Sequence, residues 1–223
     1  MASYIYIPIM TGEMAAMATD WNNGRVQLGK APYQILGADS SGIGKALRRQ
    51  FGGGYLRNVT AADKVYILAH GIKTPTSGGA LVIGVKRGAQ YVADGASLTG
   101  YSVQGGAWKY YPAGELAKHL EKEGLPKTFV DLRLFCCSAG LAATHQGNPV
   151  APYAQRLKNA LVARGYNAIV VTGYRGDLNC QYNQYCAPGT IVAMGDAIQG
   201  RGKGVKLPGD TYCSRAKNGR VQF

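Results

Sequence analysis

Short apolar runs alternate with amphipathic stretches along most of the 223-residue chain. The runs are nearly continuous, which indicates strands that are buried on both faces of a sheet. The stretches between them have a helical period, and several begin at Pro or Ser and end at Gly. This order predicts an α/β fold in which a mostly parallel sheet of about six strands lies between helices. The predicted strands are residues 4–9, 64–71, 128–137 and 166–174, and the predicted helices are residues 41–51, 112–124 and 151–165.

Other stretches carry weaker patterns. Residues 13–20 form a short segment rich in Met and Ala. Residues 80–94 alternate around a basic, glycine-containing turn, which predicts a β-hairpin. Residues 95–111 are rich in Gly, Ser and Tyr, which predicts a loop. From residue 177 onward we expect a looser C-terminal segment with one more apolar run, residues 190–198.

Composition favours one folded domain over residues 1–223, because 46% of the residues are hydrophobic and 9% are aromatic. No apolar run approaches the roughly 20 residues that a membrane-spanning helix needs. The N-terminus lacks a basic region and is interrupted by Pro8 and Gly12, so it does not resemble a signal peptide. We therefore expect a cytoplasmic protein in the producing cell, with delivery by a route that needs no cleaved signal left open.

The chain is strongly basic, with 25 Lys and Arg against 12 Asp and Glu, a net charge of +13. Such a charge favours acidic partners through long-range attraction. The basic residues are scattered, however, and no nucleic-acid-binding motif accompanies them. Nucleic acid is therefore a disfavoured partner, although a non-catalytic basic binding module remains an alternative. The five cysteines do not have the spacing of a zinc site, so no metal and no cofactor are predicted.

Two predicted strands end in reactive side chains. One ends in His70, and the other ends in Cys137, which is followed by Ser138. Ligands bind at the carboxyl ends of strands in open parallel sheets, so the two side chains meet if their strands are neighbours. A cysteine thiolate is a strong nucleophile once an imidazole takes its proton. The pattern favours His70 as general base and Cys137 as nucleophile. The amides of Gly71 and of Cys137, the latter at a predicted helix start, are candidate oxyanion donors.

The two segments "VYILAHG" and "LRLFCCSAG" resemble the caspase-like cysteine peptidases, the clan that includes caspases, legumains, clostripain and the self-processing domains of bacterial toxins. The order of elements between them is also similar, and the resemblance extends over residues 4–176. It implies a caspase-like fold, a protein or peptide substrate and cleavage through a thioester acyl-enzyme. Gly140 lies three residues after Cys137, as in the legumain and clostripain branches. Caspase specificity for aspartate is not implied, because the Gln-Ala-Cys-x-Gly signature is missing.

The resemblance also implies where the substrate binds and suggests a setting. Cys136 corresponds to the small residue before the nucleophile. The pocket for the residue before the scissile bond is built partly by the segment after the next strand, which here contains Tyr174, Arg175 and Asp177. A carboxylate in that pocket selects a basic side chain, and a guanidinium selects an acidic one. Asp177 is the favoured determinant. A bacterial effector or toxin is the expected setting, by analogy alone.

A serine hydrolase is the main enzymatic alternative. Ser138 lies between small residues, as in the nucleophile elbow of α/β-hydrolases. That fold needs a histidine late in the chain, and His145 is the only one after Ser138. Only seven residues separate the two, so His145 is expected in or just after the helix of the elbow, where it cannot serve Ser138. The oligomeric state is left open by the sequence.

Overall fold

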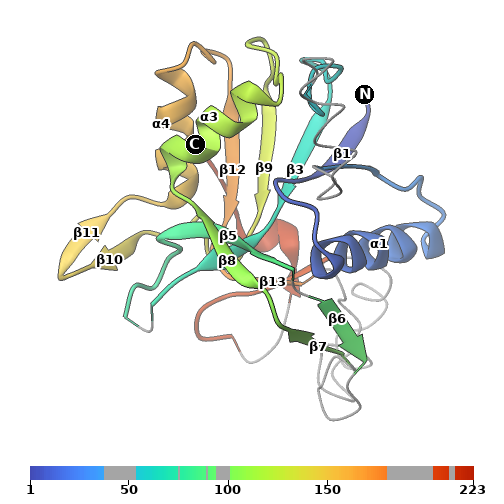
Figure 1. Cartoon of the computed structure of the whole chain (residues 1–223). Coiled ribbons are helices and arrows are strands. Elements are labelled where there is room, and N and C mark those ends of the chain that lie inside the picture. Colours follow the sequence, from blue (N-terminus) through green and yellow to red (C-terminus); the bar gives the residue numbers. More distant parts are fainter. Residues whose placement is uncertain (38–53, 75, 89, 94–100, 180–202, 211–213) are drawn as a thin grey trace.

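The structure is a computed structural model, and it describes the chain except residues 38–53, 75, 89, 94–100, 180–202 and 211–213 (Figure 1). The predicted helix 41–51 and the apolar run 190–198 lie outside the described residues, as do three of the cysteines. The described residues fold into an α/β structure, as predicted.

A six-stranded sheet forms the centre of the fold, with strand order β16-β12-β9-β3-β1-β2. Its first five strands along the chain run parallel, and β16 at one edge runs antiparallel to β12. The four central strands, β12, β9, β3 and β1, are mostly buried because apolar residues occupy most of their positions, whereas the edge strands β2 and β16 are more exposed. Their bounds are β1 Ser3–Ile7, β2 Gln34–Gly37, β3 Lys64–Leu68, β9 Asp131–Phe135, β12 Val170–Tyr174 and β16 Arg220–Gln222.

Helices cover both faces of this sheet. Helix α1, Gly12–Gln27, lies on the side opposite α3, Ala113–Lys122, and α4, Tyr153–Val162 (Figure 1). On the α1 side, the Trp21 ring packs against Phe135 with ring centroids 4.4 Å apart. The bounds of α3 and α4 agree with the two helices predicted from residues 112–124 and 151–165.

The sequence pattern does not predict helix α1, because Met and Ala follow one another at residues 14–18 and show no helical period. Its buried residues are Glu13, Met14, Ala18 and Trp21, and Met17 is partly buried. The helix starts at a well-formed N-cap, since the Thr11 hydroxyl accepts a hydrogen bond from the Met14 amide at 3.1 Å. Packing of the Trp21 ring therefore stabilises a helix that its own periodicity does not predict.

The predicted hairpin at residues 80–94 is wrong in its pairing. Both strands form, but β5 pairs with β4 and β8, whereas β6 pairs with β7. Strands β7 and β8 occupy most of the region expected to be a loop. Gly105 and Gly106, both with positive φ, separate them. The bounds are β4 His70–Ile72, β5 Val82–Arg87, β6 Gln90–Ala93, β7 Tyr101–Gln104 and β8 Ala107–Tyr111.

The remaining elements lie after Cys137 along the chain. A short hairpin precedes α4, and the C-terminal part forms a small three-stranded sheet and a 3-10 turn before β16. None of the helices in the described part of the chain combines the length and hydrophobicity that a membrane crossing requires. The elements are β10 Ala143–His145, β11 Asn148–Val150, β13 Asp177–Asn179, β14 Gly204–Lys206, β15 Ser214–Arg215 and the 3-10 turn Ala216–Gly219.

Candidate active site

The pairing of β3 with β9 brings the chain segments that carry His70 and Cys137 next to each other. The two strands are parallel neighbours with Leu68 opposite Phe135, and His70 and Cys137 each follow two residues later. His70 points to the face that α1 covers, since its imidazole contacts Glu13, whereas Cys137 lies beyond the end of β9 and its thiol contacts Leu178 of β13. The backbones are in close contact here, because a Cβ at Gly71 would lie 1.8 Å from the Cys137 carbonyl oxygen. Figure 1 shows these strand ends pointing toward β5, β8 and β13.

Glu13 and Trp108 both contact the imidazole of His70. Its Nε2 lies 2.7 Å from Oε1 of Glu13, a carboxylate that is almost completely buried in the first turn of α1. The ring also meets the edge of Trp108 on β8, with centroids 5.4 Å apart and an interplanar angle of 81°. The indole of Trp108 is 41% exposed, so His70 lies beside an open surface.

The thiol of Cys137 lies under strand β13. The amide of Leu178 donates to Sγ at 3.3 Å, and the thiol in turn points at the Leu178 carbonyl at 3.9 Å. Burial raises the pKa of Cys137 above its ordinary value, with a smaller increase from Asp177. The Leu178 amide and the Lys73 ammonium act in the opposite sense. The resting state is therefore a neutral thiol, and a base has to take its proton before it attacks.

This raised pKa makes the reactivity of Cys137 strongly pH-dependent. We expect the alkylation of Cys137 by iodoacetamide to accelerate about tenfold per pH unit from pH 7 to 9, because only the thiolate reacts and its fraction grows with pH. Mass spectrometry of peptides from the labelled protein measures Cys137 separately from the other cysteines. A rate that is already maximal below pH 7 would show instead a preformed thiolate–imidazolium pair and contradict the neutral resting state.

Cys136 points to the other face of β9 and is buried, with 1% of its surface exposed. Its Sγ lies 3.7 Å from the carbonyl oxygen of Ile67. Burial raises the pKa of this thiol well above its ordinary value. Cys136 is thus a core residue without access to a substrate side chain, although the resemblance set it next to the substrate.

A turn, rather than the expected helix, follows Cys137. Residues 136–140 form this turn, in which Ser138 adopts a left-handed conformation with φ of 54°. The hairpin β10–β11 comes next and carries His145, which is exposed. The Cys137 amide therefore lies at a turn and gains nothing from a helix N-terminus. The helix was expected because the small residues after Cys137 resemble an elbow, but the chain reverses into the hairpin before a helical turn closes.

Two glycines allow this turn to pack closely against β12. A Cβ on Gly140 would lie 2.9 Å from the backbone of Gly173, and a Cβ on Gly173 would lie 2.8 Å from Cα of Gly140. The Gly140 amide donates to the Tyr174 carbonyl at 2.8 Å. Gly140 is therefore needed for close backbone packing next to Cys137.

Ser138 faces a carboxylate. Its hydroxyl lies 3.5 Å from Oδ1 of Asp177, and its side chain is 1% exposed. His70, which follows the neighbouring strand, is bonded to Glu13. The Ser138 hydroxyl thus donates to the Asp177 carboxylate, whereas the nucleophile of a serine hydrolase donates to an imidazole.

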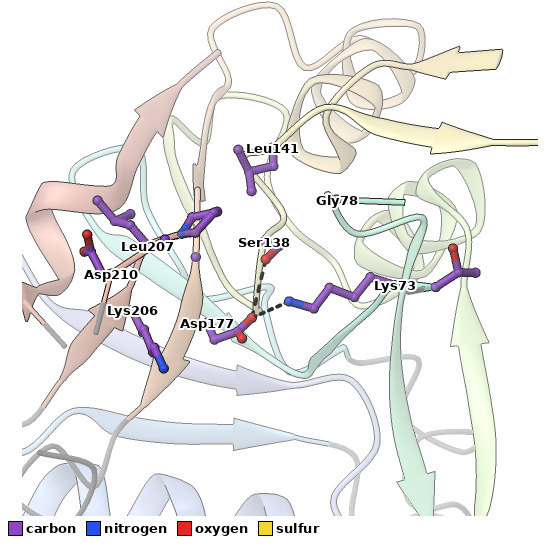
Figure 2. A pocket seen from close by; sticks show the side chains of 12 residues that line it. Lys73, Gly78, Ser138, Leu141, Asp177, Lys206, Leu207 and Asp210 are labelled. Atoms are coloured by element: carbon purple, nitrogen blue, oxygen red, sulfur yellow. Dashed lines mark hydrogen bonds and ion pairs between the residues drawn. The ribbon is translucent and has the colours of Figure 1, made fainter. Parts of the chain in front are cut away.

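A pocket of about 710 Å³ opens beside Ser138 (Figure 2). The side chains of Lys73 and Ser138 both point toward Asp177, and the ammonium of Lys73 is 2.8 Å from Oδ1 of Asp177. Both members of this ion pair are exposed, at 40% for Lys73 and 57% for Asp177. Further lining residues are Leu141, Lys206 and Asp210.

The structure separates the predicted substrate-binding residues. Asp177 lines the pocket beside the turn that follows Cys137. Tyr174 is buried and packs against Phe135, with ring centroids 6.0 Å apart. Arg175 is exposed, and its amide donates to the Gly219 carbonyl at 2.8 Å. Tyr174 and Arg175 are not among the residues that line this pocket.

Glu13 is a site residue that the sequence pattern does not indicate. A signal was available, because a neighbouring parallel strand ends close to His70 and β1 is followed by a carboxylate six residues later. Without α1, however, nothing indicated that this carboxylate turns inward.

Comparisons of the chain with protein-family models, with curated proteins and with solved structures found no match. The class that the fold defines is therefore an α/β protein with a six-stranded, mostly parallel sheet. Within the part of the chain described here, no three His, Cys, Asp or Glu side chains are grouped so that they could hold a metal ion.

Proposed function

We propose that the protein is a cysteine endopeptidase that acts through His70 and Cys137. The observation that carries this proposal is the parallel pairing of β3 with β9, because His70 and Cys137 follow the carboxyl ends of these adjacent strands. Active sites of open α/β sheets lie at such ends. The thiol also has a raised pKa, so an adjacent base has a chemical task to perform.

The reaction has two stages. In the first, the proton of the Cys137 thiol moves to His70, and the thiolate attacks the carbonyl carbon of the scissile peptide bond. The tetrahedral intermediate collapses, the C–N bond breaks, and His70 gives the proton to the leaving amine. In the second stage, water attacks the thioester, His70 takes a proton from that water and returns it to the departing sulfur. The products are a free amine and a carboxylate, and the thiol is restored.

The amides of Gly71 and Cys137 are assigned to the developing oxyanion. Gly71 lies against the backbone of Cys137, so the two amides belong to one compact region next to the sulfur. Backbone donors aimed at a developing charge contribute about 3 kcal/mol each to transition-state stabilisation. The turn at Cys137 supplies such a donor without help from a helix.

The order of the elements supports a relationship to the caspase-like peptidases. His70-Gly71 follows one central strand, Cys137 follows the adjacent one, and α3 lies between them in the sequence. A role as a bacterial effector or toxin is part of this proposal by analogy with that clan. The direct experiment is a peptide-library cleavage profile of the wild-type protein beside Cys137→Ala, and a profile that is identical for both would refute the thiol mechanism.

The pocket beside Ser138 supports a preference for a basic residue before the scissile bond. Asp177 is its carboxylate next to the active site, and its present partner Lys73 is exposed. Exposed ion pairs are worth only about 0.2–1 kcal/mol, so an incoming Arg or Lys can displace the Lys73 ammonium at low cost. The guanidinium or ammonium of the substrate then donates a hydrogen bond to the same Asp177 oxygen.

Substitution of Asp177 tests this preference. We expect Asp177→Ala to lower kcat/KM for cleavage after Arg or Lys by about fivefold, which corresponds to a loss of about 1 kcal/mol of charge pairing at an exposed carboxylate. The matched variant Lys73→Ala removes the competitor and should raise the same kcat/KM. The library profiles of both variants measure the effect, and alkylation of Cys137 serves as the control for an intact thiol. An unchanged profile in Asp177→Ala would refute this assignment.

A further inference from the structure

Glu13 has the one carboxylate oxygen among the described residues that is buried without a hydrogen-bond partner. Its side chain is 2% exposed, Oε1 bonds to His70, and Oε2 has no partner within the described part of the chain. The other two atoms of this kind are hydroxyl oxygens. Burying a carboxylate costs several kcal/mol of folding free energy unless hydrogen bonds or an opposite charge compensate for the lost water. The burial of Glu13 therefore needs an explanation. The hydrogen-bond partner of its Oε1 is His70, the proposed general base.

The fold brings Glu13 to this point through two features. Strand β1 pairs with β3 in the central sheet, so the chain that leaves β1 emerges next to His70. Thr11 then caps α1, and Glu13 falls in the first helical turn. The free amides of a helix N-terminus stabilise a negative charge. The first turn of α1 therefore fixes the position of the carboxylate, which approaches His70 from the side of Nε2.

We propose that Glu13 is a positioning residue for His70, so that the proposed peptidase uses three side chains, Glu13, His70 and Cys137. This inference rests on the proposed function for its catalytic meaning. The carboxylate accepts the hydrogen bond from Nε2–H and so fixes the neutral imidazole in the tautomer whose lone pair is on Nδ1. Nδ1 is then the atom that takes the thiol proton, and Glu13 stabilises the imidazolium that results.

A purely structural role is the competing explanation, in which the contact only attaches α1 to β4. The two explanations differ in what Glu13→Gln does. Glutamine keeps the size and an acceptor oxygen, so a structural contact survives. It lacks the charge, however, and its amide can donate to Nε2, which favours the wrong tautomer. If Glu13 positions His70, Glu13→Gln therefore lowers the rate of peptide cleavage. If the contact is only structural, Glu13→Gln leaves that rate unchanged.

The test compares Glu13→Gln with wild type and with Glu115→Gln, which is the same substitution in the first turn of α3 at an exposed position. We expect Glu13→Gln to lower kcat for peptide cleavage at least about 100-fold with KM within a factor of about 2, because the base acts in the chemical step. The midpoint of thermal unfolding should stay within a few degrees. Glu115→Gln should match wild type in every measurement.

A second measurement does not need peptidase activity. The ¹⁵N chemical shifts of the His70 ring, assigned by comparison with His70→Gln, report which nitrogen carries the proton. We expect a single Nε2–H tautomer in wild type, its loss in Glu13→Gln, and at least about 10-fold slower alkylation of Cys137 in that variant. An unchanged tautomer together with unchanged alkylation overturns the role of Glu13. A wild-type protein that cleaves no peptide but shows these effects overturns the proposed peptidase instead.

Discussion

Replacing Cys137 by alanine is expected to lower peptide cleavage by at least about 10⁴-fold, because the thioester route needs its sulfur and no other group attacks in its place. Cys136→Ala is expected to keep most of the activity. The two residues are adjacent in sequence, but the Cys136 side chain is buried on the far face of β9. Its loss should cost about 1 kcal/mol of stability and leave kcat nearly unchanged.

The pair of variants separates the candidate mechanisms. The measurements are the rate of cleavage of a fluorogenic peptide, the midpoint of chemical unfolding and the sensitivity to iodoacetamide and to a fluorophosphonate. If Cys136→Ala were inactive and Cys137→Ala active, the assignment of the nucleophile would be wrong. Inactivation by the fluorophosphonate and by Ser138→Ala would indicate the serine hydrolase. A wild-type thiol that reacts with no electrophilic peptide probe would favour the basic binding module.

Gly71→Ala is expected to have the second-largest effect, on stability as well as on activity. The added Cβ would lie 1.8 Å from the Cys137 carbonyl oxygen and 3.0 Å from the Cys137 amide nitrogen. Both atoms belong to the backbone, so no side-chain rotation relieves the overlap. Either β4 or the turn at Cys137 must move. We expect the free energy of unfolding to fall by about 3 kcal/mol and peptide cleavage to be lost.

Gly114→Ala provides the matched control for this variant. Gly114 lies in α3, and nothing lies within 4 Å of a Cβ built on it. Alanine there should raise the free energy of unfolding by up to about 1 kcal/mol, because it has the higher helix propensity. Urea unfolding of both variants measures the difference. Equal stability of Gly71→Ala and wild type would show that β4 does not lie against Cys137 as described.

The fold class and the central strands could be predicted because buried parallel strands leave long apolar runs in the sequence. Residues 64–71 and 128–137 contain β3 and β9, and α3 and α4 have clear apolar stripes. The register between β3 and β9 could not be predicted, since it depends on pairing between residues more than 60 positions apart. From the sequence alone, the proximity of the segments that carry His70 and Cys137 therefore depends on the strands being neighbours.

The missed elements share a physical cause, which is that their stability comes from distant partners. In β8 only Tyr111 is buried, so the strand shows no alternation, and it forms because β5 offers it a backbone ladder. Helix α1 depends on the packing of Trp21 against Phe135. Glu13 was missed for the same reason, because its inward orientation exists only once α1 is in position.

The two adjacent thiols that follow β9 can be used to measure how often the central sheet separates from the helices that cover it. Cys137 faces the site, whereas Cys136 reacts only when the sheet separates from the layer formed by α3 and α4. In the limit of fast reclosing, the ratio of the Cys136 labelling rate to that of an exposed thiol equals the population of the opened state. One labelling experiment on the native protein thus yields the local free energy of opening directly beneath the proposed nucleophile. No cysteine has to be introduced, because the reactive thiol and the protected thiol are adjacent in the sequence.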